Sequence, residues 1–261
     1  MYYKRLAKKY GIFLQDKNGE KIKNIGWLNG VVTERLRKCD FKKLCYITKI
    51  ECVRNNNKDV DSIPIVIPLN VLNKISDIYK KYVSLEGKLA TKKYTKNKNQ
   101  KKYVYFLVSK IKLSDKNQDN INLVYLEGKI CDKADRLSNG NNLICNLLLA
   151  IDNKNKATYY ISCVAFDTHA SKILELKVGD NIKIYGRIQS RMYVKKIPYF
   201  YFYNQKEEEI LFKLKNLFLD YMQELYDLNK LAHKIYLNSS SEDIAFVIKK
   251  EVYEVFIVKV E

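Results

Sequence analysis

The chain has 261 residues, of which 47% are hydrophobic, so it can bury a core and is not a disordered basic tail. Its 48 Lys and Arg residues exceed its 29 Asp and Glu residues, and the net charge of +19 favours a polyanionic partner over neutral or acidic small molecules. The sequence contains no run of about 18 apolar residues and no stretch typical of a signal peptide. We therefore expect a cytoplasmic protein without a membrane segment.

The sequence also argues against an enzyme. It contains no GxxxxGKS/T, HExxH or GxSxG motif, and its two histidines, His169 and His233, stand in unrelated contexts. Its six cysteines show no CxxC spacing and fall mostly in strand-like runs, which favours buried reduced thiols over a zinc site or disulfides. We expect no catalytic residue, no metal and no cofactor.

The first half of the chain reads as a series of short strands. In chain order these are "GWLNGVV", "LCYITKIECV" and "SIPIVIP", then a helix over 69–81 ("LNVLNKISDIYKK"), then "YVSLEGKLATKKY" and "YVYFLVSKIKL". The order β-β-β-α-β-β is that of the five-stranded OB-fold barrel, which commonly binds oligonucleotides.

The second half repeats the first. Gly30 in "WLNGVV" returns as Gly128 in "YLEGKI" (128 − 30 = 98), and Gly87 returns as Gly186 (186 − 87 = 99). The segment "HASKILELKVGD" stands where the first copy has its helix. We therefore predict a mainly β protein of two tandem OB-fold barrels, with a first domain and N-terminal extension at 1–113, a linker at 114–120 and a second domain at 121–261.

One hairpin is unusually basic. Residues 87–106, "GKLATKKYTKNKNQKKYVYF", hold seven lysines and no carboxylate. Strand alternation places Lys88, Ala90, Lys92 and Tyr94 on one face, and the second copy has Arg187, Gln189, Arg191 and Tyr193 at the same positions. Cations and flat rings on one face suit the phosphates and bases of a nucleic acid. The alternative is a solvated hairpin whose lysines keep a sheet edge soluble.

The second copy resembles a known family. The stretches "NLVYLEGKICDKADRL", "YISCVAFDTHA" and "GDNIKIYGRIQSRMY", with the closing "YEVFIVKVE", are similar in order and spacing to the bacterial single-stranded DNA-binding protein. The resemblance covers nearly all of 121–196 and 251–261 and is weaker over 24–112. It implies sequence-tolerant binding of single-stranded DNA without catalysis. RNA fits as well, because no visible feature reads a 2′-hydroxyl.

The resemblance places base-stacking aromatic rings at Tyr160 and Phe166, for which a core role is the alternative. The first copy has Ser62 and Pro68 at these positions, so we expect it to be the poorer stacking platform, relying on charge or serving assembly. The predicted DNA-binding residues are Lys88, Lys92, Tyr94, Lys96, Lys98, Lys101, Lys102, Tyr160, Phe166, Arg187, Gln189, Arg191 and Tyr193.

The last hairpin of the second copy is longer than its counterpart. Tyr193 to Lys259 spans 66 residues, whereas Tyr94 to Lys110 spans 16, so the second copy carries 50 additional residues. The insertion, at about 197–247, contains an apolar stripe at helical spacing. This stripe is predicted to pack on its own barrel, to bind a protein partner or a second subunit through 205–237, or to clamp bound DNA.

The resemblance also bears on assembly. Members of that family typically end in an acidic tail that recruits other proteins, whereas this sequence ends at "IVKVE", so we do not expect recruitment by a tail. Because four barrels form the usual assembly, two chains would suffice, and we predict a homodimer. We predict a role in DNA replication, recombination or mobile-element maintenance. The alternative is an assembly scaffold of a replication or conjugation complex that binds little DNA itself.

Overall fold

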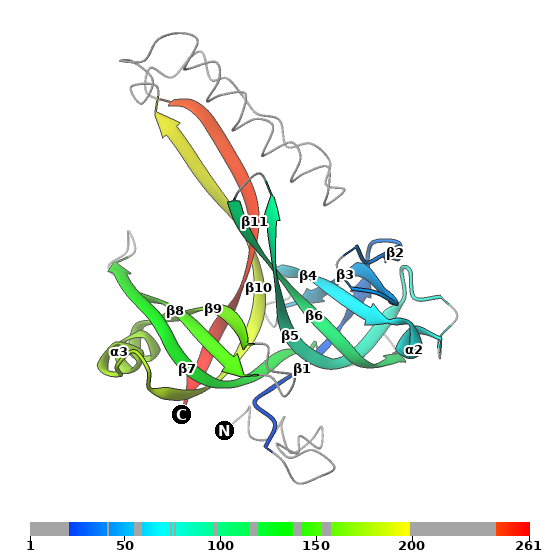
Figure 1. The fold of residues 1–261 in the computed structure, drawn as a ribbon, viewed down its shortest axis with the longest axis horizontal. Coiled ribbons are helices and arrows are strands. Elements are labelled where there is room, and N and C mark those ends of the chain that lie inside the picture. The colour runs from blue at the N-terminus through cyan, green and yellow to red at the C-terminus, as the bar shows by residue number, and fades with distance from the viewer. Residues whose placement is uncertain are drawn as a thin grey trace. The chain divides into compact units, whose positions relative to one another are not determined.

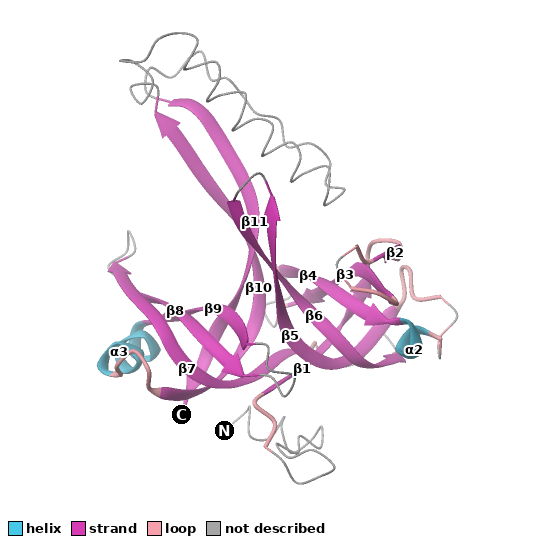
Figure 2. Ribbon diagram, viewed as in Figure 1, coloured by secondary structure: helices cyan, strands magenta, loops and turns pink. Residues whose placement is uncertain are grey.

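The computed structural model describes residues 21–198 and 244–261, apart from 41, 55–58, 74, 76, 97–98, 115–119, 138–141 and 153–157. Strands dominate this part of the chain (Figure 2). The order β-β-β-α-β-β occurs twice, apart from one short extra strand, and the prediction of two tandem OB-fold barrels is confirmed.

The first barrel closes on itself. Its described elements are β1 (Asn24–Val32), β3 (Cys45–Val53), β4 (Val60–Pro68), α2 (Leu69–Leu72), β5 (Tyr82–Lys96) and β6 (Asn99–Leu113). Strand β1 pairs antiparallel with β5 on one side and with β3 on the other, β3 pairs antiparallel with β4, and β4 pairs parallel with β6, which lies beside β5. A two-residue strand, β2 (Arg37–Lys38), pairs antiparallel with β3.

The second barrel repeats this arrangement. Its described elements are β7 (Asn122–Leu137), β8 (Leu143–Asp152), β9 (Thr158–Phe166), α3 (Asp167–Glu175), β10 (Asn181–Pro198) and β11 (Ile244–Val260). Strand β7 pairs with β10 and β8, β8 with β9, and β9 runs parallel to β11, which lies beside β10. The register of the equivalent strand pairs is also the same. Cys45 of β3 is opposite Pro68 of β4 in the first barrel, and at the equivalent positions of the second barrel Ile144 of β8 is opposite Phe166 of β9.

The helix of the first barrel is shorter than predicted. Instead of spanning 69–81, α2 covers Leu69–Leu72. The backbone N–H of Ile75 donates to the carbonyl of Leu72, a tight turn that does not continue the α-helix, and Lys80 has a left-handed φ of 58°. Ile78 is nevertheless fully buried. The apolar spacing therefore predicted the burial of this side chain correctly, but it did not predict the backbone conformation.

The two barrels are joined by their equivalent first strands (Figure 1). Strands β1 and β7 pair antiparallel, from Asn24 opposite Leu126 to Leu28 opposite Asn122. At the start of each of these strands an asparagine side chain bridges to its own barrel: Asn24 exchanges two hydrogen bonds with the backbone of Leu89, and Asn122 does the same with Ile188. The contact between the barrels is therefore made by equivalent strands of the two copies.

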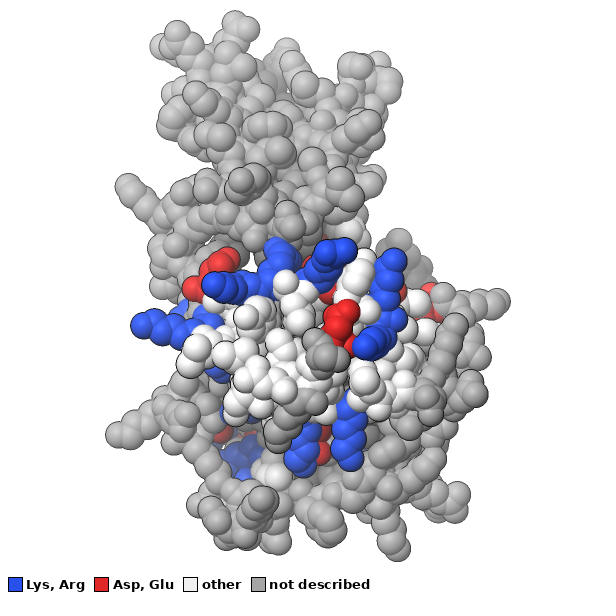
Figure 3. Space-filling view, turned by 90° about the vertical axis from the view of Figure 1, so that its right-hand side faces the viewer, with Lys and Arg blue, Asp and Glu red and all other residues white. Residues whose placement is uncertain are grey.

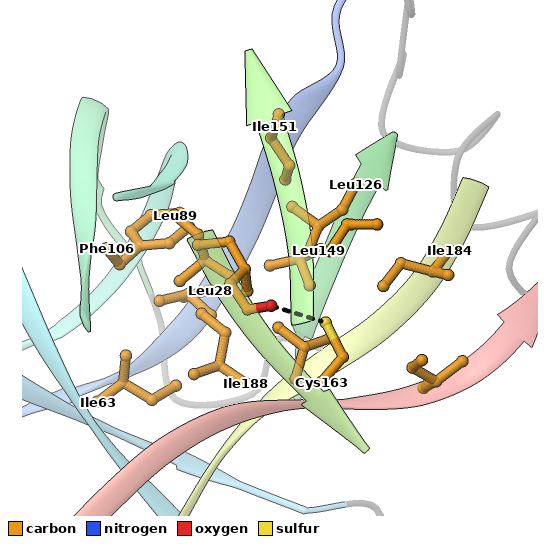
Figure 4. Close-up of a cluster of buried hydrophobic side chains, with 14 of the residues drawn as sticks. Leu28, Ile63, Leu89, Phe106, Leu126, Leu149, Ile151, Cys163, Ile184 and Ile188 are labelled. Atoms are coloured by element: carbon orange, nitrogen blue, oxygen red, sulfur yellow. Dashed lines mark hydrogen bonds between the residues drawn. The ribbon is translucent and has the colours of Figure 1, made fainter. Parts of the chain in front are cut away.

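One hydrophobic cluster runs through both barrels (Figure 4). It contains Leu28, Ile63, Leu89 and Phe106 of the first barrel together with residues of the second: Leu126, Leu149, Ile151, Cys163, Ile184 and Ile188. Because the burial of apolar surface is the main favourable term in folding, a shared core couples the stability of the two barrels.

The chain divides into two compact units. Both barrels belong to one unit, whereas residues 95–99 and 191–252 form the other. In the parallel pairings Phe106 is opposite Ile65 and Val255 is opposite Cys163. The last strands are therefore offset by 149 residues (255 − 106), which is 50 more than the offset of 99 between the preceding strands. The helix predicted within the insertion, at 205–237, lies outside the described residues. The predicted domain boundaries stay a prediction.

The repeated glycines mark close contacts between strands. A Cβ added at Gly30 would lie 2.1 Å from the carbonyl oxygen of Glu51, and one added at Gly128 would lie 2.2 Å from that of Ala150. Since a backbone oxygen cannot rotate away as a side chain can, only glycine fits here without moving the neighbouring strand.

We therefore predict that Gly128→Ala lowers the free energy of unfolding by about 3 kcal/mol, because the added methyl group forces β7 away from β8. The measurement is equilibrium urea denaturation. Lys129→Ala is the control: the Lys129 side chain, next to Gly128 in the chain, is exposed, and its truncation should change the free energy of unfolding by less than about 0.5 kcal/mol. Equal stability of the two variants would contradict the steric explanation.

Candidate nucleic-acid interface

Strands β9 and β10 each present one face to the barrel interior and one to the outside. On β9, Ile161, Cys163 and Ala165 are buried, whereas Tyr160 and Phe166 lie on the opposite face and are partly exposed. Ile188 of β10 is likewise buried between the partly exposed Arg187 and Gln189. The structure therefore places these predicted site residues on the outer face of the second barrel.

Two rings and a guanidinium group meet on this outer face. The rings of Phe166 and Phe256 are stacked with centroids 5.4 Å apart, and the guanidinium carbon of Arg187 lies 4.6 Å from the centroid of Phe256. Phe256 was not among the residues predicted from the sequence. The alternation of "VYEVFIVKV" does place it opposite the buried Val255 and Ile257, which was the available signal.

Arg187 is bound to a carboxylate of the first barrel. Its Nη1 lies 2.9 Å from Oδ2 of Asp61, which is fully buried. Arg54 binds the same carboxylate through Nη2 at 2.6 Å and Nε at 3.0 Å, and this hydrogen bond raises the pKa of the Arg54 guanidinium. Asn122 adds a weaker contact through its side-chain amide, 3.4 Å from Oδ2. Arg187 therefore serves to join the barrels.

Gln189 is also bound to a carboxylate. Its side-chain amide donates to Oε1 of Glu254 at 2.8 Å, and its oxygen accepts a bond from Arg187 at 3.3 Å. Glu254 is 9% exposed. The outer face of the second barrel thus combines stacked rings with polar side chains that are bound to two buried carboxylates, Asp61 of the first barrel and Glu254.

The corresponding face of the first barrel has different chemistry. The ammonium group of Lys88 lies 5.7 Å from the ring centroid of Tyr159, which belongs to the second barrel. Burial, and then the positive charge of Lys42, lower the pKa of Lys88. Tyr103 and Tyr105 lie nearby on β6 with stacked rings 6.0 Å apart, and burial raises the pKa of Tyr105 to about 12.

Tyr103 and Tyr159 also pack against a small apolar cluster on this face, whose buried members are Cys39, Cys45, Val66, Ala90 and Tyr105. Ala90 was predicted to point outward with Lys88, and it does share that face, but it is fully buried there. Part of this face is therefore a second core.

The remaining predicted residues lie on the long strands. Lys92 on β5 and Arg191 on β10 are exposed. Tyr94, Lys96, Lys101, Lys102 and Tyr193 belong to strands β5, β6 and β10, but their side chains lie outside the described part of the structure, as does the whole of Lys98. A DNA-binding role for all of these residues stays a prediction.

Basic side chains also gather on one side of the molecule. Figure 3 shows the side of the molecule on which β2 and β3 lie, where Lys and Arg side chains border a largely uncharged surface. Within the described residues no group of three or more His, Cys, Asp or Glu could hold a metal ion. No helix in that same part of the chain is long and apolar enough to cross a membrane.

The cysteines behave as the sequence predicted. All six are free thiols, and five of them are buried. Cys131 on β7 is the exception and is partly exposed. Burial raises the pKa of the Cys145 thiol, so that side chain stays protonated and unreactive.

Residues 121–198 match the model of the Single-strand binding protein family. This confirms the predicted resemblance for the segment that forms β7 to β10. The family is named for binding rather than for a reaction, in agreement with the lack of catalytic motifs in the sequence. No curated protein matches the chain.

Solved structures show the same fold. A deletion mutant of the single-stranded DNA binding protein from Thermus aquaticus is 19% identical, with a TM-score of 0.53 over 64% of this chain and 87% of that chain. The wild-type protein from the same organism is 18% identical, with a TM-score of 0.51 over 64% of this chain and 85% of that chain. At this level of identity the likeness concerns the fold.

The contacts of Asp61 generate a prediction about stability. Asp61→Asn should lower the free energy of unfolding by about 3 kcal/mol, because it leaves the two arginines that share this carboxylate without their common counter-charge. The measurement is chemical denaturation of the full chain. Asp59→Asn is the matched control: Asp59 also binds Arg54, but its side chain is 54% exposed, and the loss should be below about 1 kcal/mol. A stable Asp61→Asn variant would contradict a structural role.

Proposed function

We propose that this protein binds single-stranded DNA with little sequence preference and without catalysis. The observation that carries the proposal is that the segment matching the Single-strand binding protein family forms β7 to β10 of an OB-fold barrel that β11 closes. Tyr160, Phe166 and Phe256 lie on the outer face of this barrel. Aromatic rings stack on bases of any identity, and each stacked base contributes about 1–3 kcal/mol.

The charge of the chain supports a nucleic acid as the partner. A net charge of +19 attracts phosphates, and the predicted binding residues include the exposed Lys92 and Arg191. RNA is the second polyanion that fits this chemistry. We further propose a role in replication, recombination or mobile-element maintenance, and the cytoplasmic location stays a prediction.

One observation favours the alternative of an assembly scaffold. Arg187 and Gln189, at the centre of the outer face of the second barrel, are bound to Asp61 and Glu254 rather than left to face a ligand. A phosphate would have to displace these carboxylates to bind the two side chains, whereas in a scaffold the face would contact protein with these bonds intact. The two functions differ in whether the full chain binds a bare oligonucleotide.

The function predicts the outcome of a titration with fluorescently labelled oligo-dT at several salt concentrations. Affinity should fall with salt, with a slope of about −0.7 in log K against log salt for each phosphate neutralised, and single strands should bind more tightly than duplex of the same length. Oligonucleotides of other base compositions should bind with similar affinity. Absence of binding would favour the scaffold, and equal affinity for duplex would overturn the single-strand proposal.

The proposed homodimer can be tested by measuring the mass of the protein in solution. Two chains would bring together four barrels, so sedimentation equilibrium should give a mass close to twice 30.8 kDa at micromolar concentration. A mass of one chain at all concentrations would show that the paired barrels of a single chain act alone.

A further inference from the structure

The duplication relates two contacts between the barrels. Lys88 and Arg187 occupy equivalent positions (187 − 88 = 99), and so do Asp61 and Tyr159 (159 − 61 = 98). In the structure Arg187 of the second barrel binds Asp61 of the first, and Lys88 of the first barrel lies over Tyr159 of the second. The same place therefore occurs twice, once on each barrel, with different chemistry.

On the second barrel this place holds polar side chains that are already bound to two carboxylates. Asp61 is fully buried and shared by two arginines, and Glu254 on the neighbouring strand binds Gln189. A phosphate that recruited Arg187 would have to break its bond with Asp61, and breaking a buried ion pair is costly. The second barrel therefore offers rings but a poor site for phosphates.

On the first barrel the acids are replaced. The position of Glu254 is taken by Tyr105 (254 − 105 = 149, the offset of the last strands), and that of Gln189 by Ala90 (189 − 90 = 99). The ammonium group of Lys88 lies over the ring of Tyr159, and the charge of Lys42 acts on it. Two cations and three phenol rings thus gather in one patch: Lys42, Lys88, Tyr103, Tyr105 and Tyr159.

This lysine–tyrosine patch has the chemistry of a single-strand site. The charges of Lys42 and Lys88 repel each other, and a phosphate bound between them would remove that repulsion. At the equivalent position of the second barrel, a phosphate could bind Arg187 only by displacing Asp61. The rings of Tyr103 and Tyr159 are partly exposed, and aromatic rings are the groups on which the bases of a single strand stack. Because Tyr159 comes from the other barrel, the patch is complete only in the paired chain.

We infer that the lysine–tyrosine patch on the first barrel is the principal contact for the phosphates of single-stranded DNA, rather than the equivalent face of the second barrel. This inference rests on the proposed function. It reverses the expectation from sequence, in which the first copy is the poorer platform. It also adds Lys42 and Tyr159, which the sequence did not single out.

The test compares equivalent variants of the full chain. Lys88→Gln and Arg187→Gln each remove one cation from the same place on the two barrels. Labelled oligo-dT is titrated across a salt series, and melting temperature is recorded for each variant. Lys88→Gln, and likewise Lys42→Gln, should weaken binding and reduce the salt slope by about 0.7, the value for one phosphate contact, with the melting temperature unchanged.

Arg187→Gln should show the opposite result: an unchanged salt slope and a lower melting temperature, because Asp61 loses a counter-charge. Arg187→Lys keeps the charge and serves if Arg187→Gln does not fold. Tyr159→Leu should weaken binding about five-fold or more, while Tyr159→Phe, which keeps the ring, should bind as the wild type does.

The outcomes separate the two proposals. If the wild type does not bind oligo-dT, the proposed function fails, and the patch with it. If the wild type binds but the lysine variants keep its salt slope while an Arg187 variant reduces it, the function stands and the patch is overturned. If neither set of variants changes the slope, the phosphates are bound elsewhere, which also overturns the patch.

Discussion

The antiparallel pairing of β1 with β7 is the constraint on which the rest of the structure depends. It joins the equivalent first strands of two barrels, so each barrel occupies the place that an identical subunit would take in a symmetric dimer. The asparagines at the starts of these strands fasten each one to its own barrel, and one apolar cluster fills both. Contacts between the barrels therefore come in related pairs.

Duplication within one chain allows the members of such a pair to differ. In a symmetric dimer a contact from residue i to residue j implies the same contact from j to i. Here one contact is an ion pair between Arg187 and the buried Asp61, and its counterpart is Lys88 over the ring of Tyr159. One member joins the barrels through a buried ion pair, whereas the other places a cation over an aromatic ring. The two copies can thus divide tasks that identical subunits would have to combine.

Much of this fold could be predicted from the sequence, because the relevant signals are local. The glycines recur at an offset of 98 or 99 residues, and alternation along each strand separates the buried Ile188 from Arg187. The partner of Arg187 could not be predicted, because Asp61 lies 126 residues away and no periodic pattern links them. Lys42 was missed for the same reason: it lies in a loop, and only the folded chain brings its charge near Lys88. The apolar spacing at 69–81 led to the wrong prediction of a continuous helix, since Ile78 is buried although the helix ends at Leu72.

The central claim is that barrel pairing creates a site for single strands on the first barrel. Lysine acetylation read by mass spectrometry, with and without oligo-dT on the unaltered chain, tests it most directly. The account predicts that oligo-dT protects Lys42 and Lys88, while Lys129 and Lys183 on the second barrel are modified at the same rate as in the free protein. Protection of Lys129 and Lys183 with no change at Lys42 and Lys88 would contradict it.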